Sequence, residues 1–402
     1  MLEYQRQMDY KLSQLSSGLR LVSVPMKSSE SATLTVWVKT GSRNEDKKVN
    51  GISHFLEHMV FKGSKKYPNT KVLSEVFDAM GAVHNASTSK EWTNFWVKLP
   101  KADLEKGFDV ISDTMLRPLF DPKEIERERQ VILQEINMYE DTPMIQIGEF
   151  FEGLVYGGSK LGWEISGDKE SLHNIDRDEF IKYRDSNYFG ENMLVSIAGG
   201  VNESQTRILS EKYFKGLPKL GSKPHYEEFN DKQDKPRLRL KSKKNEQAHF
   251  ILGFMSQGRG YEGRFAQAVL SSILGGGLSS RLLIEVREKR GLAYAVKGSM
   301  DRYFDAGYFG VYAGVAPDKI EDAIKVIKDE CYGIANKAKK SLISKKEFEK
   351  ARGYIKGRLA LAMEDSEAVG DFFSEQILFD KKVLTPEETF KLVDKVTVDQ
   401  VY

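Results

Sequence analysis

Stretches in which hydrophobic and polar residues alternate open the chain, and longer stretches with helical periodicity follow them. Alternation with period two indicates half-buried strands, and apolar residues that recur every three or four positions indicate amphipathic helices. Strands are predicted at residues 19–24, 33–39, 83–99 and 193–198. Helices are predicted from about residue 51, and at 70–80, 101–115, 122–139 and 177–187. The first half of the chain therefore mixes strands and helices.

The second half repeats this order of elements. The stretch HFILGFMSQGR at 249–259 is similar to TLTVWVKTGSR at 33–43, and Gly291 aligns with Gly81. The separation of the two copies, from Gly81 to Gly291, indicates a duplicated domain, because the units of a solenoid span only about 20–50 residues. Helices are predicted to follow at 317–337 and 345–363. The proline- and lysine-containing segment between the halves has the composition of a linker. The predicted domains are 1–217 and 237–402, with a linker at 218–236.

Length and composition fit a globular protein of two domains. A chain of 402 residues exceeds what one core usually holds, and 40% hydrophobic with 30% charged residues is ordinary. A net charge of +2 gives no argument for nucleic acid or an anionic membrane as partner. We also expect no membrane span, because no apolar run approaches about 18 residues, and no signal peptide, because the N-terminus carries acids. The single cysteine, Cys331, excludes an internal disulfide and favours a reducing, cytoplasmic location.

The candidate chemistry is concentrated in His54-Phe55-Leu56-Glu57-His58, which reads H-x-x-E-H. On a helix, residues four apart share a face, so His54 and His58 can present two imidazoles to one metal ion. Glu57 lies on nearly the same face and could reach a water at that metal. The chance of such a motif in a chain with six histidines is on the order of one per cent. The corresponding segment of the second half has no histidine or carboxylate, so we predict one metal site, in the first half.

A catalytic zinc usually takes a third protein ligand. The predicted helix at 122–139 and the residue after it offer several glutamates, namely Glu124, Glu126, Glu128, Glu135 and Glu140. Glu128 and Glu135 are seven residues apart and therefore share a helix face. One could ligate the metal and the other support it, but the residue types leave open which does which.

The segments HFLEHMVFKGS and ERERQVILQEINMYED resemble the pitrilysin-type inverzincin metallopeptidases, the superfamily of insulin-degrading enzyme and mitochondrial processing peptidase. The family signature implies that Glu135 is the third ligand and that Glu128 supports catalysis. The resemblance spans essentially the whole chain and matches the short, two-domain bacterial-type branch. Repeat and resemblance together imply an α+β fold of two duplicated domains, each a mostly antiparallel β-sheet packed against α-helices.

The resemblance also implies residues that hold a peptide. Asn85 and Ala86 match an edge strand to which the substrate adds as a further strand. Ser87 stands where the family often has an aromatic residue, which leaves the pocket preference open. Arg287 and Tyr294 match a pair that orients the substrate and stabilises the tetrahedral intermediate. His84 is expected to be an ordinary strand residue rather than a further ligand.

The expected function is a zinc endopeptidase with one Zn²⁺ per chain, acting on peptides or extended protein segments. Glu57 would take a proton from water as general base and pass it to the leaving amine. The branch implies a homodimer in which Arg287 and Tyr294 reach the partner's site. The alternatives are a non-catalytic subunit or a heteromeric subunit of a processing peptidase.

The two halves differ at their ends. Residues 396–402 are similar to 175–181, but no counterpart of the strand at 193–198 follows them. We therefore expect the second half to lack a final strand through truncation or loss at the chain end.

Overall fold

The computed structural model describes residues 8–221, 227–231, 233–335 and 342–402, and these form two compact units. The first unit comprises Met1–Met138, Tyr156–Glu227 and Met363–Val383, and the second comprises Tyr139–Val155, Glu228–Ala362 and Leu384–Tyr402. Part of the predicted linker (222–226 and 232) and the last two residues of the predicted helix at 317–337 lie outside the described residues.

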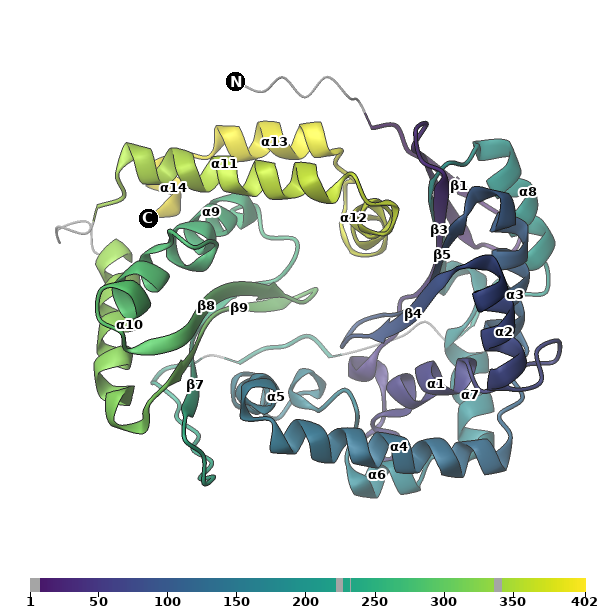
Figure 1. The fold of residues 1–402 in the computed structure, drawn as a ribbon, viewed down its shortest axis with the longest axis horizontal. Helices are drawn as coiled ribbons and strands as arrows, with labels where there is room; N and C mark the ends of the chain where they lie inside the picture. Colours follow the sequence, from purple (N-terminus) through teal and green to yellow (C-terminus); the bar gives the residue numbers. More distant parts are fainter. Residues whose placement is uncertain (1–7, 222–226, 232, 336–341) are drawn as a thin grey trace. The chain divides into compact units, whose positions relative to one another are not determined.

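The first unit is built on a sheet whose described part has six strands in the order β1-β2-β6-β3-β5-β4. Figure 1 labels β1, β3, β5 and β4 of this sheet. The strands are β1 (Lys11–Gln14), β2 (Arg20–Pro25), β3 (Ser31–Val38), β4 (Val83–Thr88), β5 (Thr93–Pro100) and β6 (Met193–Gly199). Only the β2–β6 pairing within this described sheet is parallel, and all its other pairings are antiparallel. β4 is an edge strand that pairs with β5.

Helices cover both faces of this sheet. They are α1 (Ile52–Val60), α2 (Thr70–Met80), α3 (Leu104–Leu116), α4 (Pro122–Asp141), α6 (Lys169–His173), α7 (Arg177–Asn187), α8 (Glu203–Tyr213) and α12 (Ser366–Phe379). Leu34 and Val36 of β3 point into the main core, which also contains apolar residues of α1 and α3. Side chains alternate along a strand, so Thr33 faces the other way, where its hydroxyl lies 2.8 Å from that of Ser366 on α12.

The predicted strand at 83–99 is wrong, because the structure has two strands there. β4 and β5 form an antiparallel hairpin, and the Ser89 amide donates to the Trp92 carbonyl in its turn. The turn is fixed by Arg43, whose guanidinium donates to Glu91 at 2.7 Å with both side chains about 2% exposed. A buried ion pair of this kind requires both partners to be present, since one buried charge alone is costly. The hairpin brings β4 to the edge of the sheet.

The second unit has a smaller sheet, with the described strands in the order β7-β9-β8. They are β7 (Ala248–Gln257), β8 (Ala293–Arg302) and β9 (Ala306–Val315), and both pairings are antiparallel. The helices of the unit are α5 (Pro143–Val155), α9 (Arg264–Gly275), α10 (Ile320–Ala335), α11 (Lys345–Ala362), α13 (Pro386–Lys395) and α14 (Val398–Val401). Within the described ranges only helices follow β9, and the expected truncation stays a prediction.

The structure confirms the α+β fold of two related domains. Gly81 and Gly291, aligned in the sequence, have φ angles of 60° and 59° and precede β4 and β8. This left-handed conformation favours glycine, so the two halves use the same turn to enter equivalent strands. In the described ranges, no helix combines the length and apolar character that crossing a membrane would require.

Helices α5 and α12 do not belong to the units that a division of the chain at 218–236 would assign them to. α5 lies in the second unit and α12 in the first. α5 packs on β7, where the ring of Phe151 lies against the backbone of Gly253, and the centre of that ring is 5.0 Å from the ring centre of Tyr308 on the neighbouring strand β9. α12 packs on β2, β3 and β6. Helical periodicity tells which face of a helix is apolar but not which sheet receives it.

Candidate metal centre

The H-x-x-E-H motif lies on α1, and a buried glutamate fixes where this helix begins. Glu45 is 2% exposed and accepts hydrogen bonds from the amides of Gly51 and Ser53 at 2.7 and 2.8 Å. A carboxylate at a helix N-terminus satisfies amides that have no partner within the helix. Gly51 has a φ of 97°, and a Cβ there would lie 2.6 Å from the Ser166 carbonyl oxygen. The start of α1 is therefore held rigidly.

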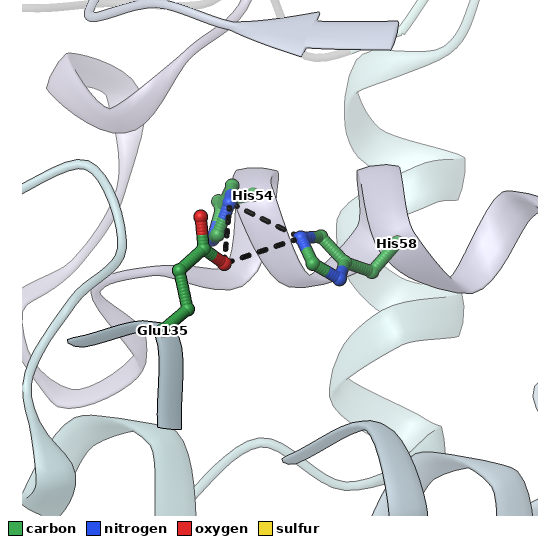
Figure 2. A group of neighbouring side chains, drawn as sticks. All are labelled: His54, His58 and Glu135. Atoms are coloured by element: carbon green, nitrogen blue, oxygen red, sulfur yellow. Dashed lines mark hydrogen bonds and ion pairs between the residues drawn. The ribbon is translucent and has the colours of Figure 1, made fainter. Parts of the chain in front are cut away.

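His54, His58 and Glu135 converge on one point (Figure 2). The Nε2 atoms of the two histidines lie 3.2 Å apart. The Glu135 Oε2 atom, on α4, lies 3.8 Å from Nε2 of His54 and 3.7 Å from Nε2 of His58. All three side chains are partly buried, with exposures of 13%, 21% and 20%.

The donor set and its dimensions fit a zinc ion. Zinc bonds of 2.0–2.2 Å in a tetrahedron place neighbouring ligand atoms about 3.4 Å apart, which is close to the three separations found here. Two imidazoles and one carboxylate are also the ligand set of many catalytic zinc sites, where the fourth position is left for water. Among the described residues this is the one group of three or more histidine, cysteine or acidic side chains close enough to share an ion.

The electrostatics keep His54 available as a ligand. Burial lowers the pKa of His54 below its ordinary value, the neighbouring His58 lowers it further, and Glu135 opposes the shift. The imidazole is therefore neutral at pH 7, and a neutral imidazole is the form that binds a metal.

Glu128 contacts His58 rather than joining the group of three. Its Oε1 lies 2.8 Å from Nδ1 of His58, and its Oε2 lies 2.6 Å from the ammonium of Lys62, two residues past the end of α1. Burial works to raise the pKa of the Glu128 carboxyl, but the hydrogen bonds from His58 and Lys62 outweigh it and hold the pKa below its ordinary value. An ionised Glu128 accepts a hydrogen bond from the Nδ1–H group of His58, and so leaves the Nε2 lone pair directed at the metal position.

We expect Glu128→Gln to weaken zinc binding by about 10- to 100-fold, since outer partners of histidine ligands contribute this much. The amide has the shape of the carboxylate but lacks the charge that pairs with His58 and Lys62. Competition with a chromophoric chelator measures the affinity. Glu124→Gln, on the same helix but outside this contact, is the control, and equal zinc affinities for the two variants would contradict the role given to Glu128.

Glu57 lies beside the ligands, and the end of the edge strand holds it. The hydroxyl of Thr88, the last residue of β4, donates to Oε2 of Glu57 at 2.5 Å. Burial raises the pKa of the Glu57 carboxyl above its ordinary value, and the hydrogen bond from Thr88 opposes the shift. A carboxylate that gains affinity for protons is suited to general-base chemistry.

Asn85 and Ala86, the residues of β4 that were predicted to hold a peptide, have side chains on opposite faces of the strand. Asn85 is exposed and Ala86 is 7% exposed and packed in the core. His84 stacks on Phe77, with ring centroids 3.8 Å apart, and is absent from the metal group. It is a packed strand residue, as the sequence favoured.

Arg287 and Tyr294 lie together in the second unit. The guanidinium of Arg287 lies 5.6 Å from the centre of the Tyr294 ring, and Tyr294 is 79% exposed. Arg287 belongs to a short π-helix, Leu283–Glu288 (η6), a geometry that occurs frequently at functional sites.

Sequence reasoning missed two residues of the site, Lys62 and Thr88. Lys62 follows His58 by four positions but lies two residues past the end of α1, so helical spacing alone does not place it beside Glu128. Thr88 follows Ala86 by two positions, so strand alternation puts the two on the same side. No pattern in the sequence indicated that this side meets Glu57.

Two family descriptions match the chain. "Insulinase (Peptidase family M16)" matches residues 20–164, and "Peptidase M16 inactive domain" matches residues 174–354. A protein of Mycobacterium leprae named an uncharacterized zinc protease is 34% identical over 96% of this chain and 86% of its own length. A Bacillus subtilis protein with the same description is 31% identical over 96% of this chain and 92% of its own length.

Solved structures share the fold. The crystal structure of a protease from Helicobacter pylori superposes with a TM-score of 0.89 at 24% identity, over 98% of this chain and 95% of that one. A Pseudomonas fluorescens structure titled as a peptidase M16 inactive domain gives a TM-score of 0.87 at 18% identity, over 98% and 93%. At these identities both likenesses show the fold alone.

Proposed function

The chain belongs to peptidase family M16, and we propose that it is a zinc-dependent endopeptidase that cleaves peptides or extended protein segments. The observation that carries the proposal is the convergence of His54, His58 and Glu135 beside a carboxylate, Glu57, that is not one of the three. The names of the zinc protease relatives support the same reading.

The proposed mechanism assigns a task to each side chain of the site. His54, His58 and Glu135 would hold one zinc ion per chain, which when bound lowers the pKa of water and polarises a carbonyl group. Glu57 accepts the proton of the attacking water and then donates it to the amine that leaves the scissile bond. Glu128 and Lys62 keep His58 in the orientation and tautomer that a ligand needs.

The edge strand β4 is the proposed binding site for the peptide. In the described sheet β4 pairs with β5 on one side, so the backbone groups on its other side can pair with an extended peptide. Asn85 and Ala86 belong to this strand, which ends at Thr88 beside Glu57. A peptide added here would run past the base and the metal ligands.

Arg287 and Tyr294 are proposed to act in the site of a second copy, which makes the active form a homodimer. An exposed tyrosine hydroxyl can donate to a developing oxyanion, and an arginine can orient a peptide carbonyl. In a mixed sample, Glu57→Gln chains would supply an intact Tyr294 and Tyr294→Phe chains an intact base. We expect mixing to restore activity that neither variant has alone, and no restoration would contradict the shared site.

The test of the proposed function is cleavage of a quenched fluorescent peptide by the purified chain. Activity should disappear on treatment with a chelator and return when zinc is added. A chain that holds zinc but cleaves no peptide, either alone or as a dimer, would instead support the non-catalytic or heteromeric alternative.

A further inference from the structure

We propose that Thr88 is a positioning residue for the general base. The proposal rests on the proposed function, because it names the group that orients Glu57 within the same reaction. The Thr88 hydroxyl donates to Oε2 of Glu57 at 2.5 Å, and both side chains are partly buried. A hydrogen bond to an ionised group contributes more than one between neutral groups, particularly away from bulk water.

The bond removes a rotational freedom that would harm catalysis. A glutamate side chain has three rotatable bonds, and its terminal torsion is broad, so an unrestrained carboxylate samples many orientations. With Oε2 engaged by Thr88, Oε1 is the oxygen left to receive the proton from water. Because Thr88 ends β4, the base is also tied to the strand proposed to bind the peptide.

This role differs from that of other hydroxyls in the same hairpin. Thr93, which faces Thr88 across the hairpin, donates to the backbone carbonyl of Thr40 at 3.0 Å. That bond stabilises the fold and touches no group of the site. Thr93 is therefore a matched control for loss of a threonine hydroxyl without loss of the contact to Glu57.

Thr88→Val tests the proposal, since valine keeps the branched shape that suits a strand and removes the donor. We expect kcat to fall by about 10- to 100-fold, as for loss of a hydrogen bond to a charged group. KM should stay within about twofold, because the hydroxyl is bonded to Glu57 and the variant keeps the backbone of β4 that is proposed to pair with the peptide, and zinc content should be unchanged. Thr88→Ser should recover most of kcat, and Thr93→Val should lower the melting temperature with kcat within about twofold of wild type.

A double variant separates positioning from a structural role. In the Glu57→Gln background, Thr88→Val should cause no further loss in residual turnover, because the bond acts through the base. The proposal is overturned if Thr88→Val keeps wild-type kcat, if Thr88→Ser loses as much as Thr88→Val, or if the loss persists in the Glu57→Gln background. Should Thr88→Val not fold, Thr88→Ala takes its place, and a parallel loss of zinc and kcat there would also overturn it.

The outcomes separate this proposal from the proposed function. A wild-type chain without peptidase activity, or a fully active Glu57→Gln variant, contradicts the proposed function. A severe loss in Glu57→Gln together with an unaffected Thr88→Val contradicts the role of Thr88 alone.

Discussion

Glu57→Gln should keep its zinc and lose at least about 100-fold of its peptide turnover, the low end of what a general base contributes. The amide cannot accept the proton of the attacking water, so the loss falls on the chemical step. Its carbonyl oxygen can still accept the hydrogen bond from Thr88, so the side chain keeps its place. Glu57 is outside the three-residue group, so the metal should remain bound.

Two measurements on one sample decide this prediction. Elemental analysis gives the zinc content, and a quenched fluorescent peptide gives kcat and KM. Glu75→Gln, an exposed glutamate on α2, controls for the loss of a surface charge. Substantial turnover by Glu57→Gln would remove Glu57 from the mechanism, and loss of zinc would mean that it holds the metal.

Glu135→Gln and His58→Ala should each lose zinc during dialysis, and with it nearly all activity. Each removes one of three donors, so the loss in affinity should exceed the roughly 10–100-fold that loss of an outer partner causes. His58→Ala also removes one of the two partners of Glu128. The other partner, Lys62, should stay paired with Glu128 in a folded variant. Zinc per chain after dialysis against a weak chelator is the readout.

The control for this second prediction is Glu140→Gln, an exposed glutamate on the same helix α4. It should retain zinc as the wild type does. A full equivalent of zinc in Glu135→Gln or His58→Ala after the same dialysis would be inconsistent with the proposed ligands. Circular dichroism of each variant distinguishes metal loss from unfolding.

The sequence was sufficient for the part of the site that lies on one helix. His54, Glu57 and His58 follow from helical spacing, because one turn determines which side chains are neighbours. The distance between α1 and α4 is set by packing, so spacing left Glu128 and Glu135 interchangeable. The family resemblance distinguished them, and the structure gives a physical reason, since Glu128 contacts Nδ1 of His58 and Lys62 while Glu135 faces both Nε2 atoms.

The fold was predictable where the pattern is local and less so where it depends on partners. Helices α2 and α7 have the predicted bounds, and the residue before α2, Asn69, caps it by accepting a hydrogen bond from the amide of Val72. The hairpin of β4 and β5 was read as one strand because both segments are rich in strand-forming residues. The turn between them depends on Arg43, which lies far away in the sequence.

The placement of α12 has a consequence for dissecting the protein. This helix belongs to the first unit, yet it follows nearly all of the second unit in the sequence. A fragment ending in the segment at 218–236 would contain all three proposed zinc ligands. It would leave one face of β2, β3 and β6 without its cover, including Thr33 and its bond to Ser366. A zinc-binding half therefore cannot be obtained by one cut, and α12 would have to be supplied as a second piece.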